Sequence, residues 1–221
     1  MKLLFSALTK FLIGLALVEL LLFLPAGSLS YPGAWRLIAL LFIPMLLLGI
    51  VLYCKAPELL KKRLNAKEKE KTQQGVIGLS GLLFPLGFIL AGLDHRFGWS
   101  VIPGWLTILC CILFLIAYGL YAEVMRENAY LSRTVEVQEG QKVIDTGLYG
   151  VVRHPMYMAS ILLFLSMPIV LGSWYALIVF AVYPLLMVIR IQNEEKLLEK
   201  ELHGYTEYKK KVRYRLIPFL W

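Results

Sequence analysis

Long runs of apolar residues alternate with short polar segments along most of this chain. A helix needs about 20 apolar residues to cross the ~30 Å hydrocarbon layer of a bilayer. Four runs of about this length occur within the first 125 residues, separated by polar or proline- and glycine-rich segments. The pattern predicts membrane helices at residues 3–24, 35–53, 76–93 and 103–121.

A fifth apolar run, at residues 156–189, is too long for one straight span. At ~1.5 Å per residue it would extend over ~51 Å, well beyond the hydrocarbon layer. Gly172 and Ser173 divide the run almost evenly and favour a turn. We therefore predict a short helical hairpin with helices at 156–171 and 174–190. The expected fold is an all-α integral membrane protein with about six membrane helices.

Two polar segments, residues 55–74 and 123–153, separate the predicted spans on one side of the bundle. The first contains seven Lys or Arg and three Glu, and such basic loops stay in the cytoplasm. The hairpin returns a basic tail to the same side, so both termini and the functional site are expected to be cytoplasmic. Residues 56–71 favour an interfacial helix, with lipid headgroup binding as an alternative use of its charges. On the opposite side we expect a brief solvated turn at residues 94–96, His95 included.

The composition excludes a soluble domain, because 59% of the residues are hydrophobic and the mean hydropathy is +0.69. The net charge of +8 lies mostly in loops beside spans, so it indicates membrane topology and not nucleic acid binding. Cys54, Cys110 and Cys111 show neither metal-ligand spacing nor a disulfide framework, and no other set of metal ligands is visible. The first apolar run lacks the cleavage site of a secretory signal, so we expect it to be retained as a span.

One polar stretch, GLYGVVRHPMY at residues 147–157, stands directly before the predicted hairpin. Polar groups at a membrane boundary are costly unless they have partners, so this stretch suggests a ligand. The simpler alternative is that Arg153 and His154 are interfacial charges and Pro155 is the first residue of a helix. Just upstream, residues 134–141 combine an alternating segment with a turn and indicate a short β-hairpin or an extended lid.

A second polar group, formed by Arg190, Glu194 and Glu195, lies at the end of the last predicted membrane helix. Residues at i and i+4 share a helix face, so an ion pair between Arg190 and Glu194 is the simplest explanation. The predicted hairpin, however, brings this helix end beside the stretch that contains His154. The sequence therefore predicts one ligand site built from both segments, with the C-terminal helix ending near Gly204.

Together these segments resemble the isoprenylcysteine carboxyl methyltransferase family, which is related more distantly to the phospholipid N-methyltransferases. The matching residues are Gly147-x-Tyr149, Arg153-His154-Pro155-x-Tyr157, Arg190-x-x-x-Glu194-Glu195-x-x-Leu198, Gly204-x-x-x-Tyr208 and Arg215-Leu216-Ile217-Pro218. The resemblance covers about residues 126–221, which it implies to be the catalytic region. Residues 1–125 would then form an N-terminal membrane region of four spans.

The resemblance implies a cytoplasmic pocket for S-adenosylmethionine, built from the loop before the hairpin, the hairpin mouth and the C-terminal helix. Carried over residue by residue, the implied cofactor contacts are Gln141, Lys142, Val143, Ile144, Tyr149, His154, Pro155, Met156, Tyr157 and Glu194. Arg190 is implied on the acceptor side, and Arg190, Glu194 and Glu195 are the candidate catalytic residues. The sequence departs from the eukaryotic enzymes at Gln141 and Lys142.

The residue types suit this cofactor. Backbone N–H groups at a helix start suit its carboxylate, with help from Arg153 or His154. Glu194 could hold its ammonium or ribose hydroxyls, and tyrosine rings offer flat faces to adenine or the sulfonium. A carboxylate acceptor needs no general base, whereas an amine acceptor has to lose a proton, for which Glu194 or Glu195 is the candidate. The expected partners are a lipophilic acceptor that enters from the bilayer and the surrounding membrane lipid.

Two other functions fit the same features. Nicotinamide-dependent membrane reductases of the sterol-reductase type carry a similar Arg-His-Pro pattern, although those chains are longer. A non-enzymatic membrane protein that binds a small molecule or haem is the third possibility. Titration with S-adenosylhomocysteine against NADPH separates the three. The sequence leaves the acceptor open among prenylcysteine carboxylates, phospholipid amines and other lipids.

Overall fold

The computed structural model describes residues 2–65 and 71–221, and in these ranges it consists of helices and loops without a strand. The helices are α1 (Lys2–Ala26), α2 (Pro32–Lys55), α3 (Pro57–Leu64), α4 (Lys71–Phe97), α5 (Gly104–Glu127), the 3₁₀ helix η1 (Gly147–Gly150), α6 (Pro155–Leu171), α7 (Trp174–Phe180), α8 (Tyr183–Glu201) and α9 (Tyr205–Lys211). This confirms the all-α class. Within the described chain, five helical segments are long and apolar enough to cross a membrane, with α7 and α8 counted as one, and α6 is shorter.

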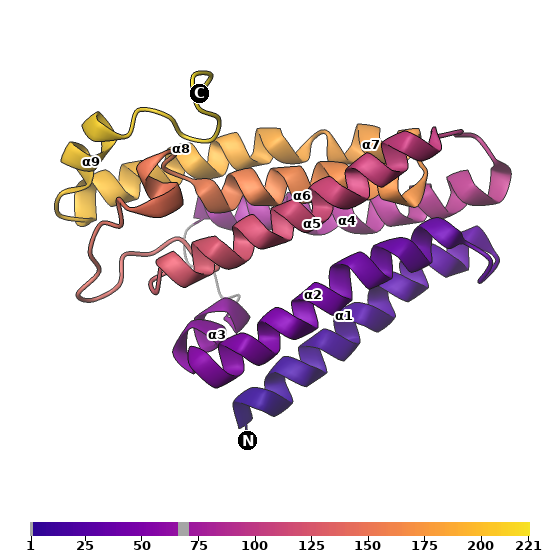
Figure 1. Ribbon diagram of the computed structural model, residues 1–221, viewed down its shortest axis with the longest axis horizontal. Coiled ribbons are helices and arrows are strands. Elements are labelled where there is room, and N and C mark those ends of the chain that lie inside the picture. Colours follow the sequence, from indigo (N-terminus) through magenta and orange to yellow (C-terminus); the bar gives the residue numbers. More distant parts are fainter. Residues whose placement is uncertain (1, 66–70) are drawn as a thin grey trace.

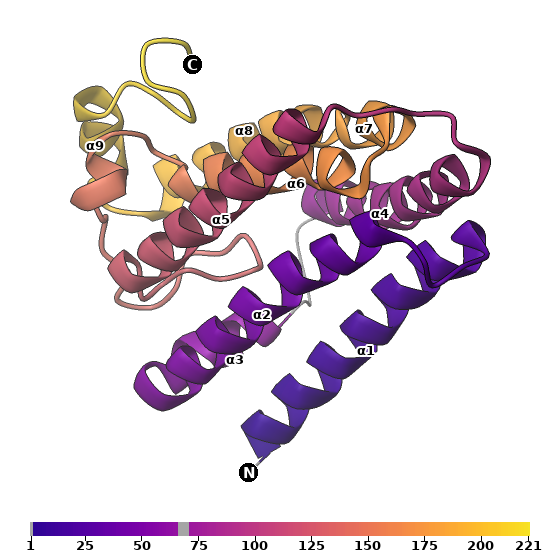
Figure 2. The ribbon, with the colours of Figure 1, turned by 45° about the vertical axis from the view of Figure 1, so that its right-hand side comes forward.

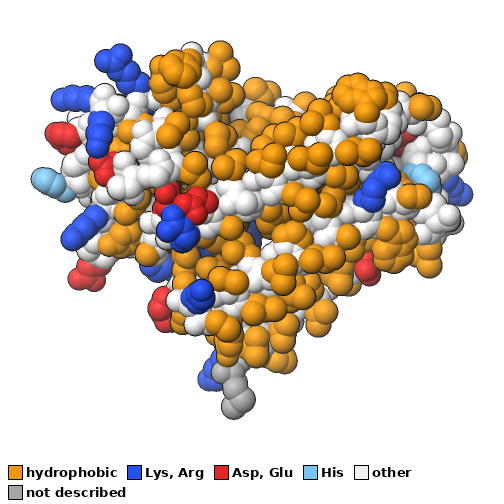
Figure 3. Space-filling model, in the orientation of Figure 1, with side chains coloured by type: hydrophobic (Ala, Val, Ile, Leu, Met, Phe, Trp, Pro, Cys, Tyr) orange, Lys and Arg blue, Asp and Glu red, His pale blue; other side chains and the backbone are white. Residues whose placement is uncertain are grey.

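Helices α1 and α2 form an antiparallel pair beside the bundle of α4 to α8, and the pair diverges from the bundle toward the N-terminus (Figures 1 and 2). The N-terminus, α3, the loop of residues 128–146 and α9 lie at one end of the molecule (Figure 1). The loops that follow α1, α4 and α6 lie at the opposite end. The polar segments thus share one end, which we call the polar end, and most of the charged side chains visible in Figure 3 gather there. Its placement in the cytoplasm stays a prediction from the charges.

Close contacts in the apolar core hold α6 and α7 against the earlier helices. A Cβ atom on Gly33 of α2 would lie 2.2 Å from the carbonyl oxygen of Leu171 at the end of α6. A Cβ atom on Gly87 of α4 would lie 2.4 Å from the ring of Phe180 in α7. Small residues at such crossings let helix backbones approach closely inside a membrane. This packing fixes the axis of α6, whose first turn contains the last three residues of the polar stretch.

Residues 94–96 are the last turn of α4 and not the solvated turn that we expected. Asp94 is buried there and accepts hydrogen bonds from the hydroxyls of Ser100 and Ser173, at 2.6 and 2.5 Å. Because its carboxylate receives donors from two neighbouring segments, the helix is held past the end of the apolar run. His95 is exposed, as predicted.

The helix predicted at residues 174–190 is interrupted between α7 and α8. Pro184 lies in the first turn of α8 and has no N–H to donate to the carbonyl of Phe180, four residues earlier. The chain therefore makes a short turn before it continues. After the turn, α8 runs beyond the apolar residues to Glu201, close to the stop predicted at Gly204.

The interfacial helix predicted at residues 56–71 is shorter than expected. Helix α3 ends at Leu64, because Asn65 takes an extended conformation. Residues 66–70 of that prediction lie outside the described residues.

Residues 134–141 form an extended loop, so of our two alternatives the structure contains the lid-like one. The turn is present, with the Gln141 N–H donating to the Gln138 carbonyl at 3.0 Å. The Gln138 side chain donates to the Tyr130 carbonyl at 2.6 Å. Side-chain hydrogen bonds of this kind, instead of pairing between strands, hold the loop in its conformation.

Candidate functional site

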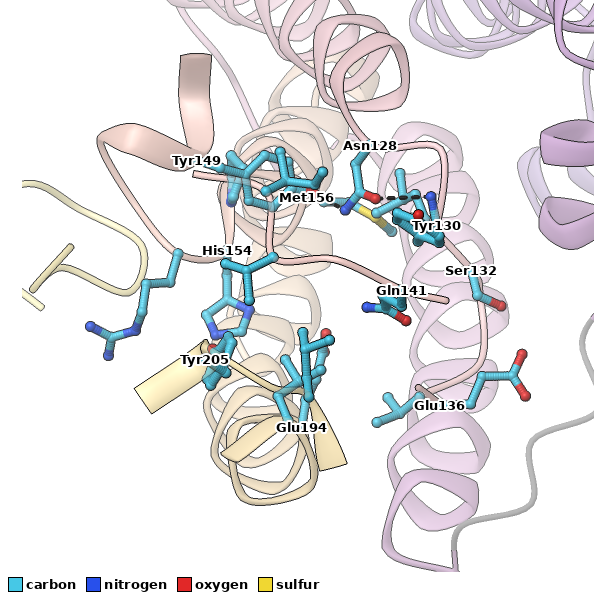
Figure 4. Close-up of a pocket in the computed structure, with 18 of the residues that line it drawn as sticks. Asn128, Tyr130, Ser132, Glu136, Gln141, Tyr149, His154, Met156, Glu194 and Tyr205 are labelled. Atoms are coloured by element: carbon cyan, nitrogen blue, oxygen red, sulfur yellow. Dashed lines mark hydrogen bonds between the residues drawn. The ribbon is translucent and has the colours of Figure 1, made fainter. Parts of the chain in front are cut away.

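A pocket opens at the polar end between the loop of residues 128–146, the start of α6 and the C-terminal part of α8 (Figure 4). Its empty space is about 870 Å³, which includes open solvent at its mouth. The walls mix tyrosine and aliphatic side chains with a few charged groups. Ligand sites commonly combine an apolar lining with a small number of placed polar groups.

The structure brings most of the sequence-predicted residues into this one pocket. It is lined by residues 141–144, Tyr149, residues 153–157, Arg190 and Glu194. Glu195 is the exception, because it lies outside the lining. Among the described residues, no group of three or more His, Cys, Asp or Glu side chains is arranged to hold a metal ion.

Glu195 is the centre of a buried ion cluster behind the pocket wall. Its side chain is 3% exposed and receives the Nε–H groups of Arg153 at 2.7 Å and Arg215 at 2.9 Å, while Nε2 of His154 lies 3.2 Å away. The backbone N–H groups of Arg153 and His154 donate to the carbonyls of Tyr214 and Arg215, both at 2.9 Å. The cluster therefore joins the start of α6 to α8 and to the C-terminal tail. A buried charge persists only where such partners surround it.

The hydroxyl of Tyr157 connects Arg190 with Glu194. It accepts a hydrogen bond from Nε of Arg190 at 2.8 Å and donates to a carboxylate oxygen of Glu194. The Arg190 guanidinium also donates to the Arg133 carbonyl in the loop, at 2.8 Å. Arg190 is buried and Glu194 is half-buried, so a fixed positive group and a more accessible negative group share one wall.

Tyr149 is held from both sides. The amide of Asn128 donates to its hydroxyl at 2.9 Å, and the hydroxyl of Tyr208 donates to its carbonyl at 2.8 Å. Burial raises the pKa of Tyr149 to about 12, so its phenol is neutral at physiological pH. Its ring thus forms a rigid, uncharged part of the pocket wall.

Gly147 makes the connection between α5 and η1 possible. Its φ of +51° is in the left-handed region, and a Cβ atom there would lie 1.3 Å from Oε1 of Glu127 at the end of α5. The other carboxylate oxygen of Glu127 accepts a hydrogen bond from the Leu148 N–H at 3.1 Å. The positive φ therefore favours glycine here, and the missing Cβ leaves room for the Glu127 carboxylate to bind the Leu148 N–H.

Several lining residues were missed by our sequence reasoning. They are Asn128, Tyr130, Leu131, Ser132, Thr134, Val135, Glu136, Leu198, Leu202, Tyr205 and Tyr208. Leu198 and Tyr208 belong to the matching motifs quoted above and could have been assigned from them. The loop residues follow no pattern that predicts a site, because their positions depend on distant contacts. Arg63 of α3, for example, donates to the Ser132 carbonyl at 3.1 Å and approaches Sδ of Met156 at 3.7 Å.

Tyr205, the first residue of α9, is 4% exposed and lines the pocket. Figure 4 shows it beside His154 and Glu194. Its hydroxyl has no hydrogen-bond partner within the described ranges of the chain. A buried hydroxyl without a partner in a pocket wall is suited to a ligand.

Comparison with known proteins finds similarity to a methyltransferase family and to a sterol reductase. The model of the phospholipid methyltransferase family matches residues 105–204, a little under half of the chain. The Delta(14)-sterol reductase TM7SF2 of Mus musculus is 26% identical over 130 residues, which are 52% of this chain and 31% of the reductase. The chain thus spans about a third of the length of that relative.

The family match runs from the start of α5 to Gly204 and includes most of the pocket lining. It supports a methyltransferase of the membrane type, in agreement with the apolar helices. The reductase match is partial and is compatible with the alternative that we drew from the Arg-His-Pro pattern.

Proposed function

We propose that this protein transfers a methyl group from S-adenosylmethionine to a lipophilic acceptor at the cytoplasmic face of a membrane. The observation that carries the proposal is the convergence of three segments in one pocket. These segments are the loop at 141–144, the stretch at 147–157 and the helix that contains Arg190 and Glu194. They are the segments that resemble the isoprenylcysteine carboxyl methyltransferases, and they lie within the matched residues 105–204.

The pocket lining fits the different parts of this cofactor. A carboxylate such as Glu194 suits an ammonium group or ribose hydroxyls, and the tyrosine rings suit adenine or a sulfonium. The buried and unpartnered hydroxyl of Tyr205 offers one more hydrogen bond to a ligand. Arg153 is less available than we expected, because its guanidinium binds Glu195 and the carbonyls of Val212 and Arg213. Its role toward the cofactor is to position His154 and Pro155.

When bound, S-adenosylmethionine supplies an electrophilic methyl group on a sulfonium, so the protein mainly has to align donor and acceptor. The polar wall around Glu194 orients the ligand, and the loop of residues 128–146 covers it. The ring of Tyr157 gives a flat surface beside these groups, while its hydroxyl bridges Arg190 and Glu194. Orientation of this kind accounts for a large part of catalysis in group transfer.

Arg190 suits the acceptor side because it lies one helical turn closer to the apolar part of α8 than Glu194 does. Its buried guanidinium favours an acceptor with an anionic group, such as an isoprenylcysteine-like carboxylate. For a lipid amine, Glu194 is the candidate general base. Glu195 is unsuited to that task, because Arg153, His154 and Arg215 surround its carboxylate outside the pocket.

A second candidate is a nicotinamide-dependent membrane reductase, which the partial match to a sterol reductase supports. Such an enzyme would bind NADPH in the same pocket. The two candidates differ in the ligand that stabilises the protein.

The deciding experiment is a thermal-shift titration of the detergent-purified protein with S-adenosylhomocysteine and, separately, with NADPH. We expect the first to raise the melting temperature and the second to leave it unchanged. Glu194→Gln should weaken the response to S-adenosylhomocysteine, whereas Arg190→Ala should keep a near-normal response. A shift with NADPH alone would favour the reductase, and no shift with either ligand would reject both enzymes.

A further inference from the structure

Tyr205 stands out among the tyrosines that line the pocket. The hydroxyls of four others are engaged: Tyr130 donates to the Gly140 carbonyl, Tyr149 accepts from Asn128, Tyr157 joins Arg190 to Glu194, and Tyr208 donates to the Tyr149 carbonyl. The hydroxyl of Tyr205 alone has no partner in the part of the chain that the structure describes.

We propose that Tyr205 is a cofactor-binding residue whose hydroxyl forms a hydrogen bond with the nucleoside part of S-adenosylmethionine. This inference rests on the function proposed above and adds a residue that the sequence comparison did not assign. Tyr205 also lies just beyond the matched residues 105–204.

The burial of Tyr205 is the first argument. Its side chain is almost fully enclosed, and a buried hydroxyl that makes no hydrogen bond costs roughly 1–3 kcal/mol. A ligand that supplies the missing bond would remove this cost on binding. Burial, with the nearby charges of Glu195 and Glu194, raises the pKa of Tyr205 well above its usual range. The phenol therefore stays protonated and can donate.

The position of Tyr205 within the pocket is the second argument. It packs with Leu202, Tyr208 and Val212, and Val143 and Leu198 lie against this group. This apolar end of the pocket suits a flat adenine ring. Arg190, which we place on the acceptor side, belongs to the wall beside Tyr157 at the start of α6.

The side chains next to Tyr205 also suit a nucleoside at this end of the pocket. Figure 4 shows Tyr205 next to Glu194, whose carboxylate suits ribose hydroxyls as acceptor. A ribose offers both donors and acceptors, so one face of it could bind the carboxylate while another accepts from the phenol.

The test compares Tyr205→Phe with Tyr208→Phe, a matched pair that removes one hydroxyl each from the same short helix. Binding of S-adenosylhomocysteine and of 5′-methylthioadenosine, which lacks the amino-acid part, is measured by calorimetry, together with the melting temperature of the ligand-free protein. Tyr205→Phe should weaken both ligands by about tenfold, the effect of one hydrogen bond, without lowering the melting temperature. Tyr208→Phe should lower the melting temperature, because its bond to the Tyr149 carbonyl is lost, and weaken binding less than threefold.

The outcomes separate this inference from the proposed function. If the wild-type protein binds neither ligand, the proposed function fails and the inference fails with it. If the wild type binds S-adenosylhomocysteine and Tyr205→Phe binds it equally well, the function stands and the role of Tyr205 is rejected. If Tyr205→Phe weakens S-adenosylhomocysteine but not 5′-methylthioadenosine, the hydroxyl serves the amino-acid part and the nucleoside assignment is overturned.

Discussion

Glu194 and Glu195 show how two adjacent and identical residues acquire different tasks. Successive residues on a helix point about 100° apart, so they face different surroundings. Glu194 is half-buried in the pocket wall, whereas Glu195 is enclosed by Arg153, His154 and Arg215. The sequence analysis predicted both glutamates as candidate catalytic residues. It could not separate them, because the partners of Glu195 come from segments 20 and 41–42 residues away.

This difference predicts that the same substitution destabilises the protein at Glu195 and leaves its stability nearly unchanged at Glu194. Glu195→Gln leaves the buried guanidinium of Arg153 and the half-buried guanidinium of Arg215 without their anion. Breaking a buried ion pair costs about 3–5 kcal/mol. We expect its melting temperature in detergent to fall by about 10 °C or more. Glu194→Gln keeps an oxygen for the Tyr157 hydroxyl and should melt within a few degrees of the wild type. Equal melting temperatures for the two variants would contradict the structural role of Glu195.

At the scale of elements, hydropathy predicted where the long helices lie but not where they end. Helix α4 continues through Asp94 because two serines from other segments donate to that carboxylate. Helix α8 begins anew because Pro184 cannot donate a hydrogen bond, a local signal that was present in the sequence. The loop of residues 128–146, here called the pocket loop, was predicted least well. Its conformation depends on contacts such as that between Arg63 and Ser132.

The joint between α5 and η1 gives a prediction at this scale. Gly147→Ala would place a Cβ atom 1.3 Å from Oε1 of Glu127, in addition to the strain of a positive φ. The carboxylate is the flexible end of the Glu127 side chain, so we expect the added methyl to displace it from the Leu148 N–H. The lost hydrogen bond adds to the backbone strain, and together they should lower the melting temperature by about 5–10 °C. S-adenosylhomocysteine binding should weaken as well, because Tyr149 is two residues away. Gly140→Ala is the control: its φ of +71° is also positive, but no atom lies within 4 Å of the added Cβ. That strain alone is worth about 1–2 kcal/mol, so a Gly140→Ala protein as unstable as Gly147→Ala would reject the steric explanation.

For the whole molecule, the sequence predicted a site shared by distant segments, because the order of the spans predicted which helix ends lie on the same side of the membrane. In the structure the N-terminal helix reaches α3 through Lys10, whose ammonium donates to the Leu64 carbonyl at 2.6 Å. Helix α3 in turn reaches the pocket loop through Lys62, which donates to the Ala129 carbonyl at 3.2 Å. The N-terminus, the basic loop and the pocket therefore form one polar end. This position agrees with the function that we propose, in which the cofactor enters from water and the acceptor from the adjacent bilayer.

The side of the membrane that this polar end faces is the last prediction. The positive-inside rule places it in the cytoplasm, where S-adenosylmethionine would be available. The test starts from a chain in which Cys54, Cys110 and Cys111 are replaced by serine, and adds either Lys210→Cys in α9 or Ser28→Cys in the loop after α1. Both positions are exposed, and they lie at opposite ends of the molecule. A maleimide that cannot cross membranes should label Ser28→Cys in intact cells and Lys210→Cys only after the cytoplasmic face is opened. Labelling of Lys210→Cys from outside would reverse the topology and separate the pocket from the cofactor that we propose. Labelling of both positions from one side would contradict the antiparallel arrangement of the helices.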